Sequence, residues 1–128
     1  MTAPQWLDDT VRVFGRQLRL QRLTLGANGV AGVAFADGAA LKLEYSRERL
    51  AVMVTRPIAP SPRAAAAVLA AAHPRARGEF LIRSGLFAAA GKAFFTVVLA
   101  EREVTADRLA KAFQELWAAA AAATGAAI

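Results

Sequence analysis

The sequence contains no cysteine and only one histidine among its 128 residues. Without cysteine, the chain can form neither a disulfide nor a thiolate metal site, and this fits a reducing compartment. It also lacks a glycine-rich phosphate loop, and its acidic residues show no pairing typical of general acid–base catalysis. We therefore expect no catalytic site, no metal and no cofactor, and an enzyme is the least favoured class.

Long apolar runs are missing as well. The apolar runs that are present, such as residues 117–123, are mostly alanine and much shorter than the roughly 20 residues that span a bilayer. The N-terminus has no basic segment followed by an apolar one, so we expect no secretory signal. These features predict a soluble cytoplasmic protein without a membrane partner. The length favours one domain over residues 1–128.

Positive charge is in excess, because 16 Lys and Arg residues stand against 10 Asp and Glu, a formal net charge of +6. Such a chain can bind nucleic acid, anionic lipid or an acidic protein, or it can simply reflect an arginine- and alanine-rich composition. Arg12, Arg16 and Arg19 have the spacing of one helix face. That face is either solvated, with an ion pair to Asp8 or Asp9, or it steers a partner. A basic nucleic-acid-binding or regulatory protein is the alternative function, although no basic strand interleaved with aromatics supports it.

Apolar periodicity predicts three helices and five strands. Leu7, Val11, Phe14 and Leu18 follow the spacing of one helix face within residues 4–23. The other expected elements are strands over 30–35, 40–45 and 50–56, a helix over 63–73, strands over 79–87 and 93–101, and a final helix capped by Thr105. This order, α-β-β-β-α-β-β-α, is typical of an α+β fold with helices packed on an antiparallel twisted sheet.

Several local signals sharpen this prediction. Residues 37–38, Asp-Gly, suit a type I′ hairpin turn, because both residues tolerate a positive φ. The strand over 93–101 is apolar on both faces, so we expect it to be covered on both sides. Gly15 is costly inside a helix and indicates close packing there. His73, next to Pro74, is expected to interact with the end of the second helix.

Residues 14–20, Phe-Gly-Arg-Gln-Leu-Arg-Leu, precede a three-stranded block with Asp37-Gly38 and, later, an aromatic strand. This arrangement resembles the class I chaperones of type III secretion systems, the Tir-chaperone-like family, over nearly the whole chain. The resemblance implies a small cytoplasmic homodimer. Such a protein would bind the N-terminal region of a secreted effector and keep it soluble and export-competent, without nucleotide hydrolysis.

The resemblance also implies two surfaces. In that family the first helix and neighbouring sheet offer apolar grooves to the effector, while the second helix and fourth strand form the dimer contact. The implied effector-binding residues are Leu18, Leu20, Leu23, Val33, Phe35 and Leu43, with Arg16 beside them. The implied dimer residues are Val68, Leu69, Phe80, Ile82 and Leu86.

Two readings of these features stay open at this point. Leu20 and Leu23 continue the apolar stripe of the first helix, so they either cap the core or form an exposed patch for a partner. Members of the family are usually acidic, whereas this chain is basic. A basic chaperone would suit an acidic client segment.

Overall fold

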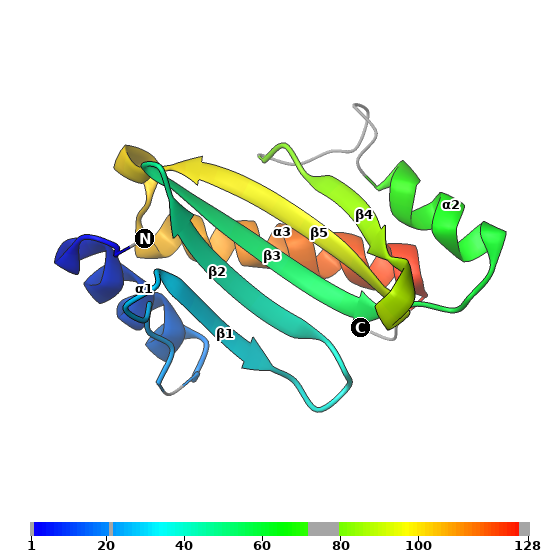
Figure 1. Ribbon diagram of the computed structural model, residues 1–128, viewed down its shortest axis with the longest axis horizontal. Helices are drawn as coiled ribbons and strands as arrows, with labels where there is room; N and C mark the ends of the chain where they lie inside the picture. Colours follow the sequence, from blue (N-terminus) through cyan, green and yellow to red (C-terminus); the bar gives the residue numbers. More distant parts are fainter. Residues whose placement is uncertain (1, 21, 72–79, 126–128) are drawn as a thin grey trace.

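A computed structural model describes residues 2–20, 22–71 and 80–125 of the chain. Within them, five strands form one antiparallel sheet in the order β1-β2-β3-β5-β4, accompanied by three α-helices (Figure 1). The elements are α1 (Gln5–Gln17), β1 (Val30–Ala34), β2 (Ala40–Ser46), β3 (Arg49–Pro57), α2 (Pro62–Ala70), β4 (Arg83–Phe87), η1 (Ala88–Ala90), β5 (Lys92–Ala100), η2 (Glu101–Glu103) and α3 (Ala106–Thr124). The predicted α+β class and the predicted order of helices and strands are confirmed.

The strands alternate in burial because helices cover only one face of the sheet. Along β2, Leu41 and Leu43 are buried, whereas Lys42 and Glu44 between them are exposed. The helix α3 runs across the covered face behind β3 and β5, with α1 near one end and α2 near the other (Figure 1). The core therefore lies between the sheet and the helices, and no described element covers the opposite face.

The first helix carries the predicted apolar stripe on its inner side. Leu7, Val11 and Phe14 are fully buried, and the ring of Phe14 meets that of Phe113 in α3 edge-on, with centroids 6.3 Å apart. Leu18, the last residue of the expected stripe, is only half-buried. The stripe thus fixes α1 against α3, as its spacing predicts.

The expected extent of this helix, residues 4–23, is wrong, because α1 ends at Gln17. Its end is a Schellman motif: the Leu20 N–H donates to the Gly15 carbonyl at 2.7 Å, and the Arg19 N–H donates to the Arg16 carbonyl at 3.0 Å. Arg19 takes a φ of 58° at the position that glycine usually occupies. The sequence therefore lacks the glycine that normally signals such an end.

The expected type I′ turn at residues 37–38 is also wrong. Only Gly38 of that pair has a positive φ, 88°, and its N–H donates to the Phe35 carbonyl at 3.1 Å. This geometry fits a three-residue loop in which glycine forms the bulge. The pattern of a type I′ turn occurs instead between β2 and β3, where Arg47 and Glu48 have φ values of 51° and 62°.

The strand β5 departs from its prediction too. Phe95 and Val97 point into the core, but Val98 on the other face is 53% exposed. Within the described residues of a single chain, β5 is therefore covered on one side only. The outer face of β5 is thus an apolar surface, although the sequence pattern predicts that it is buried.

The second and third helices begin at side-chain caps. The Ser61 hydroxyl accepts the Ala64 N–H at 3.1 Å before α2, and the predicted cap at Thr105 accepts the Arg108 N–H at 3.1 Å before α3. The expected end of α2 near residues 73–74 lies outside the described residues. The strand expected over 79–87 begins at Arg83.

Candidate functional site

A pocket of about 450 Å³ lies beside the last turns of α1. Its walls come from α1 and from the segment that follows it. The lining residues, which we call the arginine pocket, are Arg12, Arg16, Leu20, Arg22, Leu23 and Thr24. The pocket thus combines three guanidinium groups with two leucines, and none of its lining residues is acidic.

The turn after α1 builds the floor of this pocket. After the Schellman motif the chain reverses again at Arg22, whose φ is 70°, and Leu23 returns to the core. A Cβ atom on Gly15 would lie 2.9 Å from the Leu23 Cβ and 3.1 Å from the Leu20 carbonyl oxygen. The return therefore requires glycine at this place in α1, and the expectation of close packing at Gly15 is confirmed.

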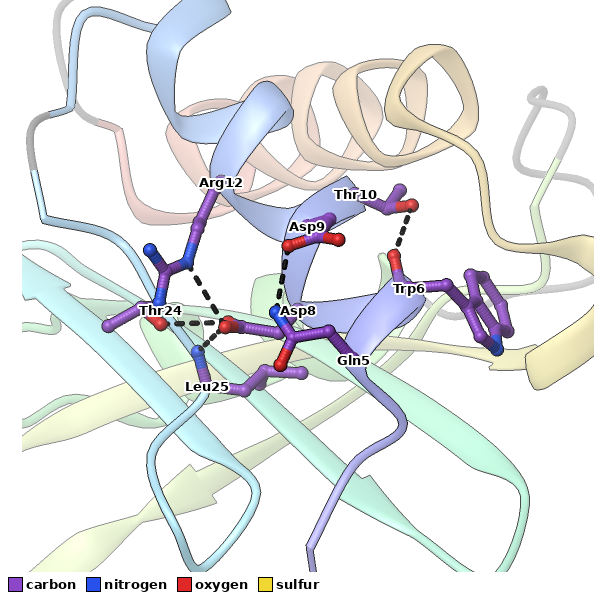
Figure 2. A network of polar contacts seen from close by, with 8 residues as sticks. All are labelled: Gln5, Trp6, Asp8, Asp9, Thr10, Arg12, Thr24 and Leu25. Atoms are coloured by element: carbon purple, nitrogen blue, oxygen red, sulfur yellow. Dashed lines mark hydrogen bonds and ion pairs between the residues drawn. The ribbon is translucent and has the colours of Figure 1, made fainter.

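One carboxylate ties the returning segment to the helix (Figure 2). Asp8 accepts the Thr24 hydroxyl at 2.7 Å and the Leu25 N–H at 2.8 Å on Oδ1, and Arg12 Nε at 3.0 Å on Oδ2. We call these four residues the Asp8 clasp. The clasp confirms the expected ion pair between Arg12 and the start of the helix, and it holds one wall of the arginine pocket in place.

The clasp also sets the charge of the pocket. Burial opposes ionisation of Asp8, but the hydrogen bonds from Thr24 and Leu25 and the charge of Arg12 outweigh it, so the pKa of Asp8 is lowered. Arg12 is thereby neutralised by its partner. Arg16 and Arg22 have no side-chain hydrogen bond or ion pair with any part of the chain that the structure describes. Two uncompensated guanidinium groups therefore border the pocket.

A second surface is the open face of the sheet at β4 and β5. Phe87 and Phe94 stack there with ring centroids 4.8 Å apart, and Leu81 is 73% exposed. With Val98 they form what we call the open sheet face. A Cβ atom on Gly85 would lie 2.4 Å from the tip of the Phe94 ring, so this glycine lets the ring lie flat on β4. Exposed apolar groups gathered in this way are typical of a surface that another chain covers.

A third surface surrounds α2. Leu69 is 58% exposed on this helix, and Leu86 is exposed on the neighbouring β4. Between α2 and α3 lies a shallow hollow of about 610 Å³ whose walls are mostly alanine. Alanine side chains leave the two helix backbones accessible to close approach, so this side of the molecule is thin and apolar.

In residues 2–20, 22–71 and 80–125, no three His, Asp or Glu side chains come together as metal ligands. None of the described helices has both the length and the apolar character that crossing a bilayer requires.

The sequence profile of the type III secretory system chaperone SycN matches residues 6–122 of the chain. The protein belongs to this family of type III secretion chaperones. The resemblance suggested by residues 14–20 is thereby confirmed. No curated protein matches the sequence.

Three solved structures share the fold. A chain of the ExsC–ExsE complex is 18% identical, with a TM-score of 0.71, and the match covers 94% of this protein and 92% of that chain. A chain of the HopA1–SchA chaperone–effector complex is 19% identical, with a TM-score of 0.65 and 86% of each chain covered. The Yersinia pestis chaperone SycH in complex with a fragment of YscM2 is 14% identical, with a TM-score of 0.67 and 89% and 96% covered.

The expected effector-binding residues of this chaperone divide into three groups. Leu43 is fully buried and Leu23 nearly so, hence neither has surface to offer a client; for Leu23 the reading as a cap of the core holds. Leu18, Leu20 and Val33 are half-buried at the rim of the core. Phe35 is half-buried and packs on the ring of Trp117 at 5.2 Å, while Arg16 is exposed.

The expected dimer residues divide in the same way. Val68 is fully buried and holds α2 to the rest of the chain. Leu69 and Leu86 are exposed, and Phe80 and Ile82 are half-buried. Four of the five therefore have surface on the α2–β4 side that a partner chain can cover.

Sequence reasoning missed two arginines. Arg22 forms part of the arginine pocket only because the chain reverses after α1, and no periodic pattern indicates this. Arg56 is only 5% exposed: its guanidinium lies 4.3 Å from the centre of the Trp117 ring and pairs with Asp37 at 3.0 Å. Arg56 stands two residues after Val54 in β3 and therefore lies on the same buried face, which could have been predicted from the strand pattern.

Proposed function

We propose that this protein is a cytoplasmic chaperone that binds the N-terminal region of a type III secreted effector. It keeps that effector soluble and export-competent by binding alone, without nucleotide hydrolysis or other catalysis. The observation that carries the proposal is the family match over residues 6–122. Apolar surfaces left uncovered in one chain support it, because a binder of extended segments needs grooves with polar rims.

The client surface that we propose lies around the end of α1 and the edge strand β1. It comprises the half-buried Leu18, Leu20, Val33 and Phe35, with the exposed Arg16 beside them. Each of the four apolar side chains packs against the core, so a bound client segment would extend the existing core packing rather than form a separate apolar patch.

We further propose that two copies pair through the α2–β4 side. Leu69 and Leu86 would be central, flanked by Phe80 and Ile82. The small side chains of α2 would let the partner approach closely. Two exposed leucines on neighbouring elements, rimmed by alanine, are the kind of apolar centre that a dimer contact buries.

The function is tested by co-expressing the protein with the large secreted proteins encoded near its gene. We expect one of them to co-purify, and its N-terminal region alone to suffice. Light scattering should give twice the 13.5 kDa chain mass for the free chaperone. A protein that stays monomeric and leaves every effector of its secretion system unbound would falsify the proposal.

Pairing is tested separately with the double variant Leu69→Asp and Leu86→Asp. Burying two unpaired charges at the centre of the contact should weaken dimerisation about 30-fold or more. Val13→Asp, at an exposed apolar residue of α1, is the matched control and should leave the dimer intact. Sedimentation velocity over a concentration series would show both results, and a double variant that dimerises like the wild type contradicts this interface.

A further inference from the structure

The arginine pocket is built to hold negative charge beside an apolar group. Arg16 and Arg22 stand at its rim without partners among the described residues, and Leu20 lines its floor. The remaining arginine of the pocket is already paired with Asp8 at 3.0 Å. A ligand would therefore meet two free guanidinium groups around apolar surface, and no carboxylate of the pocket lining would repel it.

The pocket is also held in shape before any ligand arrives. The Asp8 clasp fixes Thr24 on one wall, and the Schellman motif fixes the backbone of Leu20 on the floor. The backbone of Arg22 has a left-handed conformation, which residues other than glycine adopt only at a cost in free energy. Because these hydrogen bonds do not depend on a ligand, binding would cost less conformational entropy than the ordering of a flexible loop would.

Charge complementarity decides the kind of occupant. We infer that the arginine pocket binds an extended client segment in which an apolar residue is flanked by carboxylates; this rests on the proposed chaperone function. The apolar side chain would lie on Leu20, and the carboxylates would meet Arg16 and Arg22, whose planar guanidinium groups suit carboxylate oxygens. The lining contains no aromatic ring on which a base could stack, so single-stranded nucleic acid fits it poorly.

Two labelled peptides test the chemistry directly. The first is Gly-Ser-Glu-Leu-Glu-Leu-Ser-Gly, and the second replaces both glutamates by glutamine. Fluorescence anisotropy with the wild-type chaperone should show the acidic peptide binding about tenfold more tightly, a difference that falls as salt is raised. Equal binding of the two peptides would overturn the inference.

Variants locate the effect. Arg16→Gln with Arg22→Gln should bring the acidic peptide down to the affinity of the glutamine peptide. Arg63→Gln with Arg102→Gln removes the same charge from exposed arginines of α2 and η2 and should preserve the preference. Circular dichroism would check that both variants fold. If the control pair lowers acidic-peptide binding as much as the pocket pair, only the net charge acts, and the inference is wrong.

Charge reversal gives a result that misfolding cannot mimic. Arg16→Glu with Arg22→Glu should reject the acidic peptide and prefer a version in which lysine replaces both glutamates. A 20-nucleotide single-stranded DNA serves as the competing probe. If this DNA binds more tightly than the acidic peptide and depends on the same two arginines, the pocket is a nucleic-acid site and the inference fails.

The two levels of proposal fail separately. An effector that still co-purifies undiminished with the Arg16→Glu, Arg22→Glu chaperone would refute the pocket assignment and leave the chaperone function standing. Absence of any bound effector with the wild-type protein would refute the chaperone function itself. Reduced effector recovery with the pocket variant, but not with the Arg63 and Arg102 control, would support both.

Discussion

The helices α1 and α2 contact the two ends of α3 but are attached to the molecule in different ways (Figure 1). The first buries Leu7, Val11 and Phe14 completely and is tied to the following segment by the Asp8 clasp. The second buries only Val68 among its residues, and the Ser84 hydroxyl of β4 donates to the carbonyl of that valine at 2.6 Å. Three large side chains of α1 are thus buried in the core, whereas α2 contributes one.

This difference assigns different tasks to the two sides. On the α1 side the inward-facing residues Leu7, Val11 and Phe14 are buried within one chain, so a ligand there meets a half-buried rim with free arginines. On the α2 side Leu69 and Leu86 keep apolar surface in water, which costs about 25 cal/mol per Å² and favours a covering partner. We therefore expect substitutions on the α1 side to act on folding and client chemistry, and those on the α2 side to act on assembly.

The largest contrast should come from truncating one large apolar residue on each side. Phe14→Ala removes a fully buried ring that contacts Phe113, and we expect the free energy of unfolding to fall by about 3–5 kcal/mol. Leu69→Ala, at an exposed position, should change the unfolding of the monomer by less than about 0.5 kcal/mol. Urea unfolding at one fixed protein concentration, low enough to keep the chain monomeric, measures both.

A similar loss in the two variants would contradict the contrast. It would mean that Leu69 is buried by the chain itself in solution. The same experiment at high concentration should separate the variants further, because Leu69→Ala would then weaken a dimer that stabilises the folded state.

The next largest contrast should be between the hydrogen bonds of Asp8 on the α1 side and that of Ser84 on the α2 side. Asp8→Ala leaves the Leu25 N–H and the Thr24 hydroxyl without their charged acceptor, and we expect a loss of about 2–3 kcal/mol. Ser84→Ala removes one neutral hydrogen bond between β4 and α2 and should cost about 1 kcal/mol. Equal losses would show that α2 is held as firmly as the segment after α1.

Acid should expose the same difference. Because the pKa of Asp8 is lowered on folding, its contribution to stability is complete above the unfolded pKa and is lost as pH falls through the folded pKa. Wild-type stability should therefore fall more steeply than that of Asp8→Asn as the pH is lowered below about 4. Parallel pH profiles for the two proteins would show that protonation of Asp8 does not cause the loss of stability in acid.

Gly15 in α1 and Gly85 in β4 provide a smaller contrast. At Gly15 a methyl group would meet the Cβ of Leu23 and a backbone oxygen, neither of which can move alone. Overpacking should outweigh the gain in helix propensity, leaving a net loss of about 1–2 kcal/mol for Gly15→Ala. At Gly85 the obstacle is the tip of the Phe94 ring on the open sheet face, which can swing into solvent, so Gly85→Ala should cost less. The reverse order in urea unfolding would show that the open sheet face is the more rigid one.

The amount that could be predicted from the sequence follows the same division. The stripe of Leu7, Val11 and Phe14 and the alternation of β2 are periodic, so the order of elements and the covered face of the sheet were predictable. The end of α1 was not, because the Schellman motif uses Arg19 where a glycine would have been the signal. That one missed turn also hid Arg22 and with it half of the arginine pocket.

Burial of single residues was the other limit. A strand that is apolar on both faces has the same pattern whether a helix, a second chain or water lies on its outer side, so the exposure of Val98 could not be foreseen. Leu43 and Leu23 were expected at a client surface because the family resemblance implies which region binds a client, but not how deeply each side chain in that region is buried. The burial of Leu43 follows from the alternation of β2, which the implied regions did not take into account. The burial of Leu23 depends on the turn that returns it beside Gly15, and this turn is a property of the tertiary structure.

The smallest expected effects concern the two connections with left-handed residues. Between β2 and β3, Glu48 takes a φ of 62° without being glycine, so Glu48→Gly should stabilise the fold by about 0.5–1 kcal/mol. Between β4 and β5 that conformation belongs to Gly91, whose φ is 64°. An added Cβ would meet no atom within 4 Å, so only the backbone strain acts and Gly91→Ala should destabilise by about 1 kcal/mol. Thermal unfolding resolves shifts of this size. If Glu48→Gly lowers the stability instead, the glutamate makes a contribution at this turn that outweighs its backbone strain, and strain at a turn would no longer mark a place where the sequence can be improved.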